Sequence, residues 1–77
     1  MKTITLQPNV WVEISSESCK YQNISNNGIY TFEGTEAPEG LDDIFIAKPL
    51  DMYLFTSSSN NKLYAYSPYS EARITVG

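Results

Sequence analysis

The side chains of this sequence that could do acid–base or nucleophilic chemistry are carboxylates, tyrosines, serines and a single thiol. The chain has nine aspartate or glutamate residues, six tyrosines, one cysteine and no histidine. A serine nucleophile needs a neighbouring base, and there is no histidine to serve as one. Asp42 and Asp43 are adjacent, so they need not converge on one site, and no nucleophile is placed near them. The sequence therefore predicts a protein that is not an enzyme and uses no cofactor.

Metal binding is the other chemistry that carboxylates can support. The segment 34–43 holds four acidic residues but lacks the D-x-[DN]-x-[DN]-G-x₅-E pattern of a calcium loop. Cys19 has neither a second thiol nor a histidine to complete a zinc site. We therefore interpret segment 34–43 as an exposed acidic loop that binds no metal and could dock on a basic partner surface.

Tyrosine offers a large rigid ring with a polar tip, which protein interfaces favour. Tyr64 and Tyr66 are two residues apart and share one face of a strand, while Leu63 and Ala65 share the other face. If Leu63 and Ala65 face the core, the tyrosines point outward beside Tyr53 of the preceding strand and form an aromatic strip. The alternative is that the tyrosines pack in a second core layer, with their hydroxyl groups at its rim. The sequence leaves both arrangements open.

Two further residues belong to the predicted partner surface. Val10, Val12 and Ile14 predict the core face of their strand, so that Trp11 projects from the opposite face, as a core or interface anchor or as a ring that stacks on a sugar. Arg73 points away from the core and could pair with an acidic residue across the sheet or across a subunit interface. The predicted partner-binding residues are Trp11, Tyr53, Tyr64, Tyr66, Arg73, Glu36, Glu39, Asp42 and Asp43.

These side chains lie on short segments in which apolar and polar residues alternate, and clusters of Gly, Pro, Asn and Ser separate the segments. No segment has apolar residues at helical spacing over two turns. We expect strands at 2–6, 10–15, 19–25, 29–33, 52–56, 62–67 and 72–76, and either a buried strand or a turn of 3₁₀ helix at 44–46. Asn-Gly at 27–28 predicts a type I′ hairpin, and the last two strands predict another. Residues 1–77 therefore predict a single all-β domain, a small antiparallel sandwich or barrel of about seven or eight short strands.

Size and charge limit the possible partners. A chain of 77 residues buries only about 60–65% of its unfolded surface, so we expect oligomerisation or docking onto a larger body to add stability. A net charge of −4 argues against nucleic acid as a partner. The first residues lack the apolar core of a signal peptide, and no later segment is long enough to span a bilayer. We therefore expect synthesis in a cytoplasm and no membrane partner.

Four motifs follow one another in the second part of the chain: Gly-Ile-Tyr-Thr-Phe at 28–32, Ala-Pro-Glu-Gly-Leu at 37–41, Leu-Tyr-Ala-Tyr-Ser at 63–67 and Ala-Arg-Ile-Thr-Val at 72–76. In this order they resemble the short virion proteins of tailed bacteriophages, which include capsid-decorating and tail-associated β-modules. The resemblance covers roughly residues 29–76. It implies a structural protein of the virion, commonly a homotrimer, that binds a larger virion protein. It transfers no catalytic or ligand-binding residue.

Two other functions remain open. The aromatic strip could be the stacking platform of a small carbohydrate- or receptor-binding module. Alternatively, the chain could be an acidic inhibitor or immunity-type protein whose loop 34–43 enters a basic enzyme cleft, with association accelerated by charge.

Overall fold

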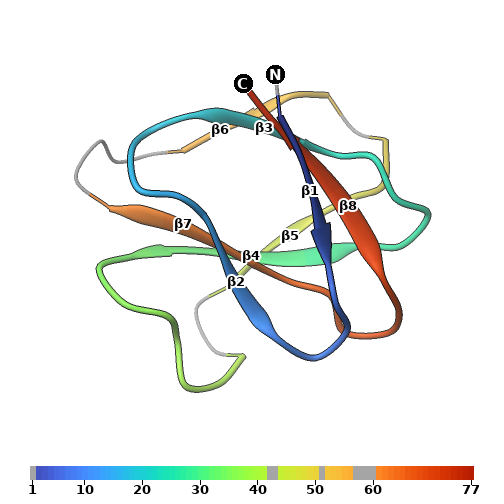
Figure 1. Ribbon diagram of the computed structural model, residues 1–77, viewed down its shortest axis with the longest axis horizontal. Helices are drawn as coiled ribbons and strands as arrows, with labels where there is room; N and C mark the ends of the chain where they lie inside the picture. The colour runs from blue at the N-terminus through green and yellow to red at the C-terminus, as the bar shows by residue number, and fades with distance from the viewer. Residues whose placement is uncertain (1, 42–43, 51, 57–60) are drawn as a thin grey trace.

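The computed structural model describes residues 2–41, 44–50, 52–56 and 61–77 (Figure 1). Within these ranges the chain forms eight short strands and no helix, which confirms the all-β prediction. The strands are β1 (Lys2–Leu6), β2 (Trp11–Ser15), β3 (Lys20–Asn23), β4 (Ile29–Gly34), β5 (Phe45–Ala47), β6 (Leu54–Phe55), β7 (Lys62–Tyr66) and β8 (Ala72–Val76).

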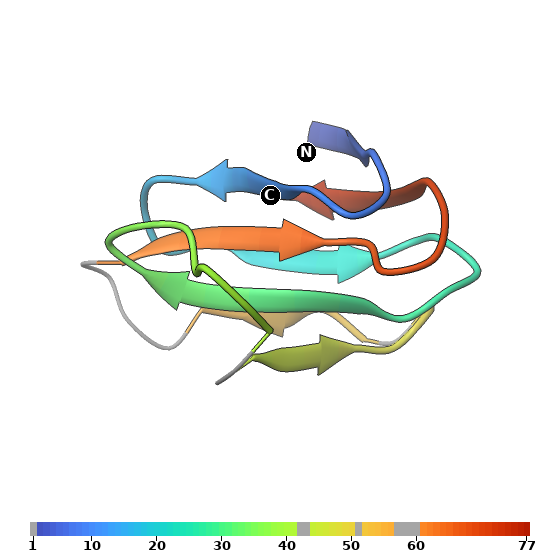
Figure 2. The ribbon, with the colours of Figure 1, turned by 90° about the horizontal axis from the view of Figure 1, so that it is seen from below.

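The strands build two antiparallel four-stranded sheets, consistent with the predicted small sandwich. One sheet has the order β1-β8-β3-β6 and the other the order β2-β7-β4-β5. Consecutive strands β1 and β2, β3 and β4, and β7 and β8 each lie in different sheets, so that the chain repeatedly crosses from one layer to the other (Figures 1 and 2). Among the described residues, no helix is long and apolar enough to cross a membrane.

Both predicted hairpins are therefore wrong. β7 pairs with β2 and β4, whereas β8 pairs with β1 and β3, so residues 67–71 form a corner between the sheets. The buried Ser67 fixes this corner, because its hydroxyl donates to the carbonyl of Ser70 and its own carbonyl accepts from Asn9 N at 2.8 Å. Asn27 and Gly28 lack the positive φ of a type I′ turn and also join different sheets. Strand alternation looks the same in a hairpin and in such a crossing.

The core lies between the two sheets and is built by the inward face of each strand. Leu63 and Ala65 of β7 are fully buried, so they face the core as the first alternative required. Val12 and Ile14 of β2 also pack against or within it. Val10 is wrongly predicted as core: it is exposed, because β2 begins only at Trp11 and residue 10 belongs to the crossing from β1. The other fully buried apolar residues are Leu6, Ile29, Ala47 and Ile74.

Asn23 is the main buried polar residue of this core, at 1% exposure. Its side-chain Nδ2 donates to the carbonyls of Asn27 at 2.7 Å and Ala47 at 3.0 Å, and its Oδ1 accepts from Ser25. Its backbone carbonyl accepts from Leu50 N at 2.8 Å. Asn23 therefore ties β3 of one sheet to the segment that follows β5 of the other. The expected inward residue of this strand, Ile24, is only half-buried, because alternation places Asn23 and Ser25 inward instead.

Candidate functional site

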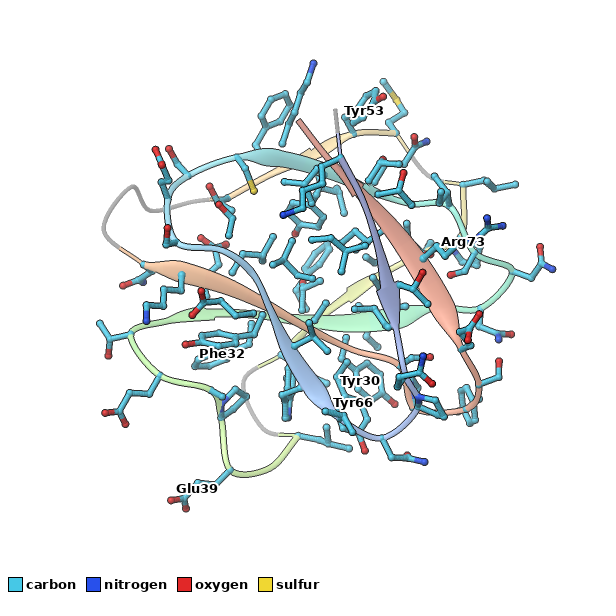
Figure 3. All side chains as sticks on the ribbon, viewed as in Figure 1. Tyr30, Phe32, Glu39, Tyr53, Tyr66 and Arg73 are labelled. Atoms are coloured by element: carbon cyan, nitrogen blue, oxygen red, sulfur yellow. The ribbon has the colours of Figure 1, made fainter. Side chains whose placement is uncertain are left out.

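The outer face of the β2-β7-β4-β5 sheet carries an aromatic layer made of Trp11, Tyr30, Phe32, Tyr64 and Tyr66. The strand register places Tyr66 of β7 between Trp11 of β2 and Tyr30 of β4. The Tyr66 ring lies 5.2 Å from the Trp11 ring, and it stacks on the Tyr30 ring with centroids 6.0 Å apart (Figure 3). Both sides of the Tyr66 ring are therefore covered by neighbouring rings.

The same layer buries Tyr64. The rings of Trp11 and Phe32 approach edge to face, with centroids 6.5 Å apart. Because β7 lies between β2 and β4, these two rings meet above β7. Tyr64 is consequently only 6% exposed. The Phe32 ring also lies over Gly34, where a Cβ atom would meet Phe32 Cε2 at 2.5 Å, so a glycine at the end of β4 makes room for this ring.

The aromatic layer decides the question that the sequence left open. Tyr64 and Tyr66 do lie on the face opposite Leu63 and Ala65, but they pack in a second layer rather than in an open strip. The hydroxyl of Tyr66 lies at the rim, where it donates to Asn9 Oδ1 at 3.2 Å. The prediction of Tyr64 as an exposed anchor is wrong, because its cross-strand neighbours close over it.

The predicted neighbours of Tyr64 and Tyr66 are also wrong. Tyr53 and Phe55 lie at β6, which pairs with β3 in the other sheet. Figure 3 shows Tyr53 at the opposite end of the view from Tyr66. Tyr53 instead contacts Lys20, whose Nζ lies 5.1 Å from its ring centroid. Adjacent segments of the sequence do not form adjacent strands here, because β6 and β7 belong to different sheets.

The polar members of the predicted surface lie apart from one another. Arg73 is exposed on β8, where its cross-strand neighbour in β1 is Thr5 rather than an acidic residue. Glu36 and Glu39 are exposed on the connection after β4, and Figure 3 shows Glu39 at its tip, far from Arg73. Asp42 and Asp43 lie outside the described residues. Among the described residues, no group of three or more His, Cys, Asp or Glu could hold a metal ion.

The most exposed apolar surface lies elsewhere, along the outermost strands β5 and β6. These strands end their sheets on the same side of the sandwich, at the bottom of Figure 2. Six large apolar side chains of this segment are 40–83% exposed. We call this surface the apolar edge; it consists of Phe45, Ile46, Leu50, Met52, Tyr53 and Phe55.

A cavity of about 350 Å³ opens between the two sheets at the apolar edge. Tyr21, Leu54 and Phe55 line it from one sheet, and Glu33 and Phe45 line it from the other. Burial raises the pKa of the Tyr21 phenol, a hydrogen bond with Thr31 opposes this, and the charge of Glu33 adds to it. Burial likewise raises the pKa of the nearby Cys19 thiol. The sandwich is thus open between its two sheets at the apolar edge.

Sequence reasoning missed the apolar edge. Residues 44–46 were expected to form a buried strand or a 3₁₀ turn; the strand exists, but Phe45 and Ile46 are exposed because β5 is outermost. One signal was present. The run Ile-Phe-Ile-Ala at 44–47 has no polar residue between its apolar ones, so whichever face lies outside must carry an apolar side chain. Comparison of the chain with protein-family models, curated proteins and solved structures found no match.

Proposed function

We propose that this protein is a non-enzymatic structural module of a tailed-bacteriophage particle, and that it binds through its apolar edge. The observation that carries the proposal is the concentration of exposed apolar side chains. Of the nine exposed large hydrophobic residues in the described ranges, six lie between residues 45 and 55. A concentration of exposed apolar side chains along two edge strands marks an interaction site more often than scattered surface residues do.

The size of the edge fits a stable interface. Large apolar side chains offer roughly 200 Å² each, so the exposed fractions of these six correspond to an area on the order of 800 Å². One partner contributes about 800 Å² to an interface of standard size.

The aromatic layer supports a protein partner over a sugar. A ring binds a sugar by presenting an open face, and the Tyr66 ring has neighbours on both sides. The Tyr66 hydroxyl lies at the exposed rim of the layer, where it donates to Asn9. The layer thus serves the stability of the sheet, and the binding function falls to the apolar edge.

Charge gives the module an orientation on a larger virion protein. The chain has a net charge of −4, and Glu36 and Glu39 are exposed on a loop that projects from the sandwich (Figure 3). Exposed charges of one sign steer association with a surface of the opposite sign. We propose that this loop faces a basic region of the particle.

Mass spectrometry of purified particles from the phage that encodes the chain tests this function. We expect the protein at a fixed stoichiometry to the major capsid or tail protein. Phe55→Ser should reduce incorporation strongly. The matched control is Tyr69→Ser, which removes an aromatic side chain of similar exposure outside the edge. Absence of the wild-type protein from the particles would contradict the proposal.

A further inference from the structure

We propose that the apolar edge is occupied by a second copy of this chain, packed edge to edge about a two-fold axis. This inference rests on the proposed function in taking the edge as a binding surface, and it deepens that proposal by naming the partner. The arguments concern the position of the edge strands, the signs of the nearby charges and the cavity at the centre of the patch.

The position of the strands leaves both sheets open on one side. In the described part of the chain β5 pairs only with β4, and β6 only with β3. Outermost strands present backbone groups to any chain that approaches, and proteins normally cover or charge such edges. Here the edge strands are short and Lys48 and Pro49 follow β5, which limits backbone pairing, but the exposed side chains are mostly apolar. Because β5 has three residues and β6 has two, side chains rather than a long backbone ladder must supply most of the contact.

Charges of both signs border the edge. Lys20 lies against Tyr53 on one sheet, Glu33 lines the cavity on the other, and the exposed Lys48 directly follows β5. A strongly basic partner would be repelled by the lysines at this edge, and a strongly acidic partner by Glu33. A second copy carries both signs, and a two-fold axis brings each patch onto the same patch of its partner. Basic residues of one copy can then approach acidic residues of the other.

The cavity at the edge suits a side chain of the second copy. It is lined by Tyr21, Phe45, Leu54 and Phe55 together with the carboxylate-bearing Glu33, and it has room for a side chain. Met52 belongs to the same patch and is 83% exposed. A methionine side chain is unbranched and flexible, and it fills irregular apolar gaps well. In a two-fold pair, Met52 of each copy would enter the cavity of the other.

This arrangement differs from the homotrimer that the resemblance implies. A closed ring of three needs two different complementary patches on each subunit, whereas a two-fold pair needs one patch that complements itself. In the described ranges the exposed apolar residues concentrate in one such patch. The patch geometry therefore favours a pair, and three copies are an alternative outcome of the experiment.

Analytical ultracentrifugation of the full chain over a range of concentrations tests the pair. We expect twice the mass of one chain. Each copy carries a charge of −4, so raising salt from about 0.05 M to about 0.5 M should screen repulsion and strengthen association. Met52→Asp should weaken the pair at least about 100-fold, because it places a charge in the apolar contact. Met52 is largely exposed in the single chain, so this variant should stay folded by circular dichroism.

The matched control is Tyr69→Asp, which introduces the same charge at an exposed ring outside the edge and should leave the pair intact. Wild-type protein that stays monomeric, that forms a trimer, or that pairs equally well with Met52→Asp would overturn the inference. Particle incorporation is scored separately. A stable pair that is absent from particles overturns only the proposed function, whereas a monomer found in particles overturns only the pair.

Discussion

The aromatic layer and the apolar edge are both apolar, but their side chains are covered by different things. In the aromatic layer, rings from three neighbouring strands cover one another, and Tyr64 in the middle is almost fully buried. At the apolar edge, β5 and β6 have no further strand beside them in the described part of the chain, and Met52 and Phe55 are 83% and 71% exposed. The residue types alone do not separate the two surfaces, since interfaces are enriched both in the tryptophan and tyrosine of the layer and in the phenylalanine and methionine of the edge. What a surface does depends on whether its side chains cover one another.

Truncation of Tyr64 should break the aromatic layer and cause the largest loss of stability. Removing a buried aromatic side chain leaves a cavity, and we expect Tyr64→Ala to lower the free energy of unfolding by about 3 kcal/mol. Phe55→Ala at the apolar edge should change it by less than about 0.5 kcal/mol in the monomer, since an exposed ring loses few contacts. Urea denaturation at low protein concentration measures both. Equal losses would erase the distinction between the two surfaces.

Asn23 should hold the apolar edge in place, with the next largest effect. Asn23→Ala removes the donor to the carbonyls of Asn27 and Ala47 and the acceptor for Ser25, and leaves these groups buried. We expect a loss of about 2–3 kcal/mol in the free energy of unfolding. In this variant the amide hydrogens of β5 should also lose more of their protection against exchange, relative to wild type, than those of β7. Asn26→Ala, at an exposed position, is the control, and unchanged protection of β5 would argue against this role.

The coupling energy between two aromatic side chains should distinguish rings that are in contact from rings that lie only on successive segments of the sequence. A double-mutant cycle with Tyr30→Leu and Tyr66→Leu should give a coupling energy of about 0.5–1.5 kcal/mol, because these rings stack. The same cycle with Tyr53→Leu and Tyr66→Leu should give a coupling near zero, because Tyr53 directly precedes β6 of the other sheet. A large coupling in the second cycle would restore the aromatic strip expected from the sequence.

These comparisons show how far the sequence predicts this molecule. Alternation predicted the all-β class and most strand positions, and it placed Leu63 and Ala65 on the face opposite Tyr64 and Tyr66 without deciding which face is inward, since period-two patterns depend only on local backbone geometry. The same pattern could not tell which strands pair. That choice depends on residue pairs distant in sequence, such as Trp11 with Tyr66 and Tyr66 with Tyr30. The aromatic layer and the apolar edge both follow from this pairing, so neither could be placed from alternation alone.

Alkaline pH should weaken the fold beneath the apolar edge, with a smaller effect. The folded-state pKa of Tyr21 is raised, mainly by burial, above the usual value of about 10. Above pH 10 the unfolded chain therefore loses this proton first, and stability falls as pH rises toward the folded pKa. Tyr21→Phe should remove part of this fall, as measured by urea denaturation between about pH 8 and pH 11. An identical pH dependence in both proteins would contradict a buried phenol at this site.

The acidic loop should have the smallest effect on stability, which separates it from both surfaces. Glu36→Gln combined with Glu39→Gln should change the free energy of unfolding by less than about 0.5 kcal/mol, because both side chains are exposed. Removing two carboxylates changes the net charge from −4 to −2, so the pair should associate slightly more tightly. Glu17→Gln combined with Glu71→Gln makes the same change of charge at other exposed positions. If both double variants bind particles at equally reduced rates, overall charge steers the protein; a slower rate for the loop variant alone assigns the steering to the loop.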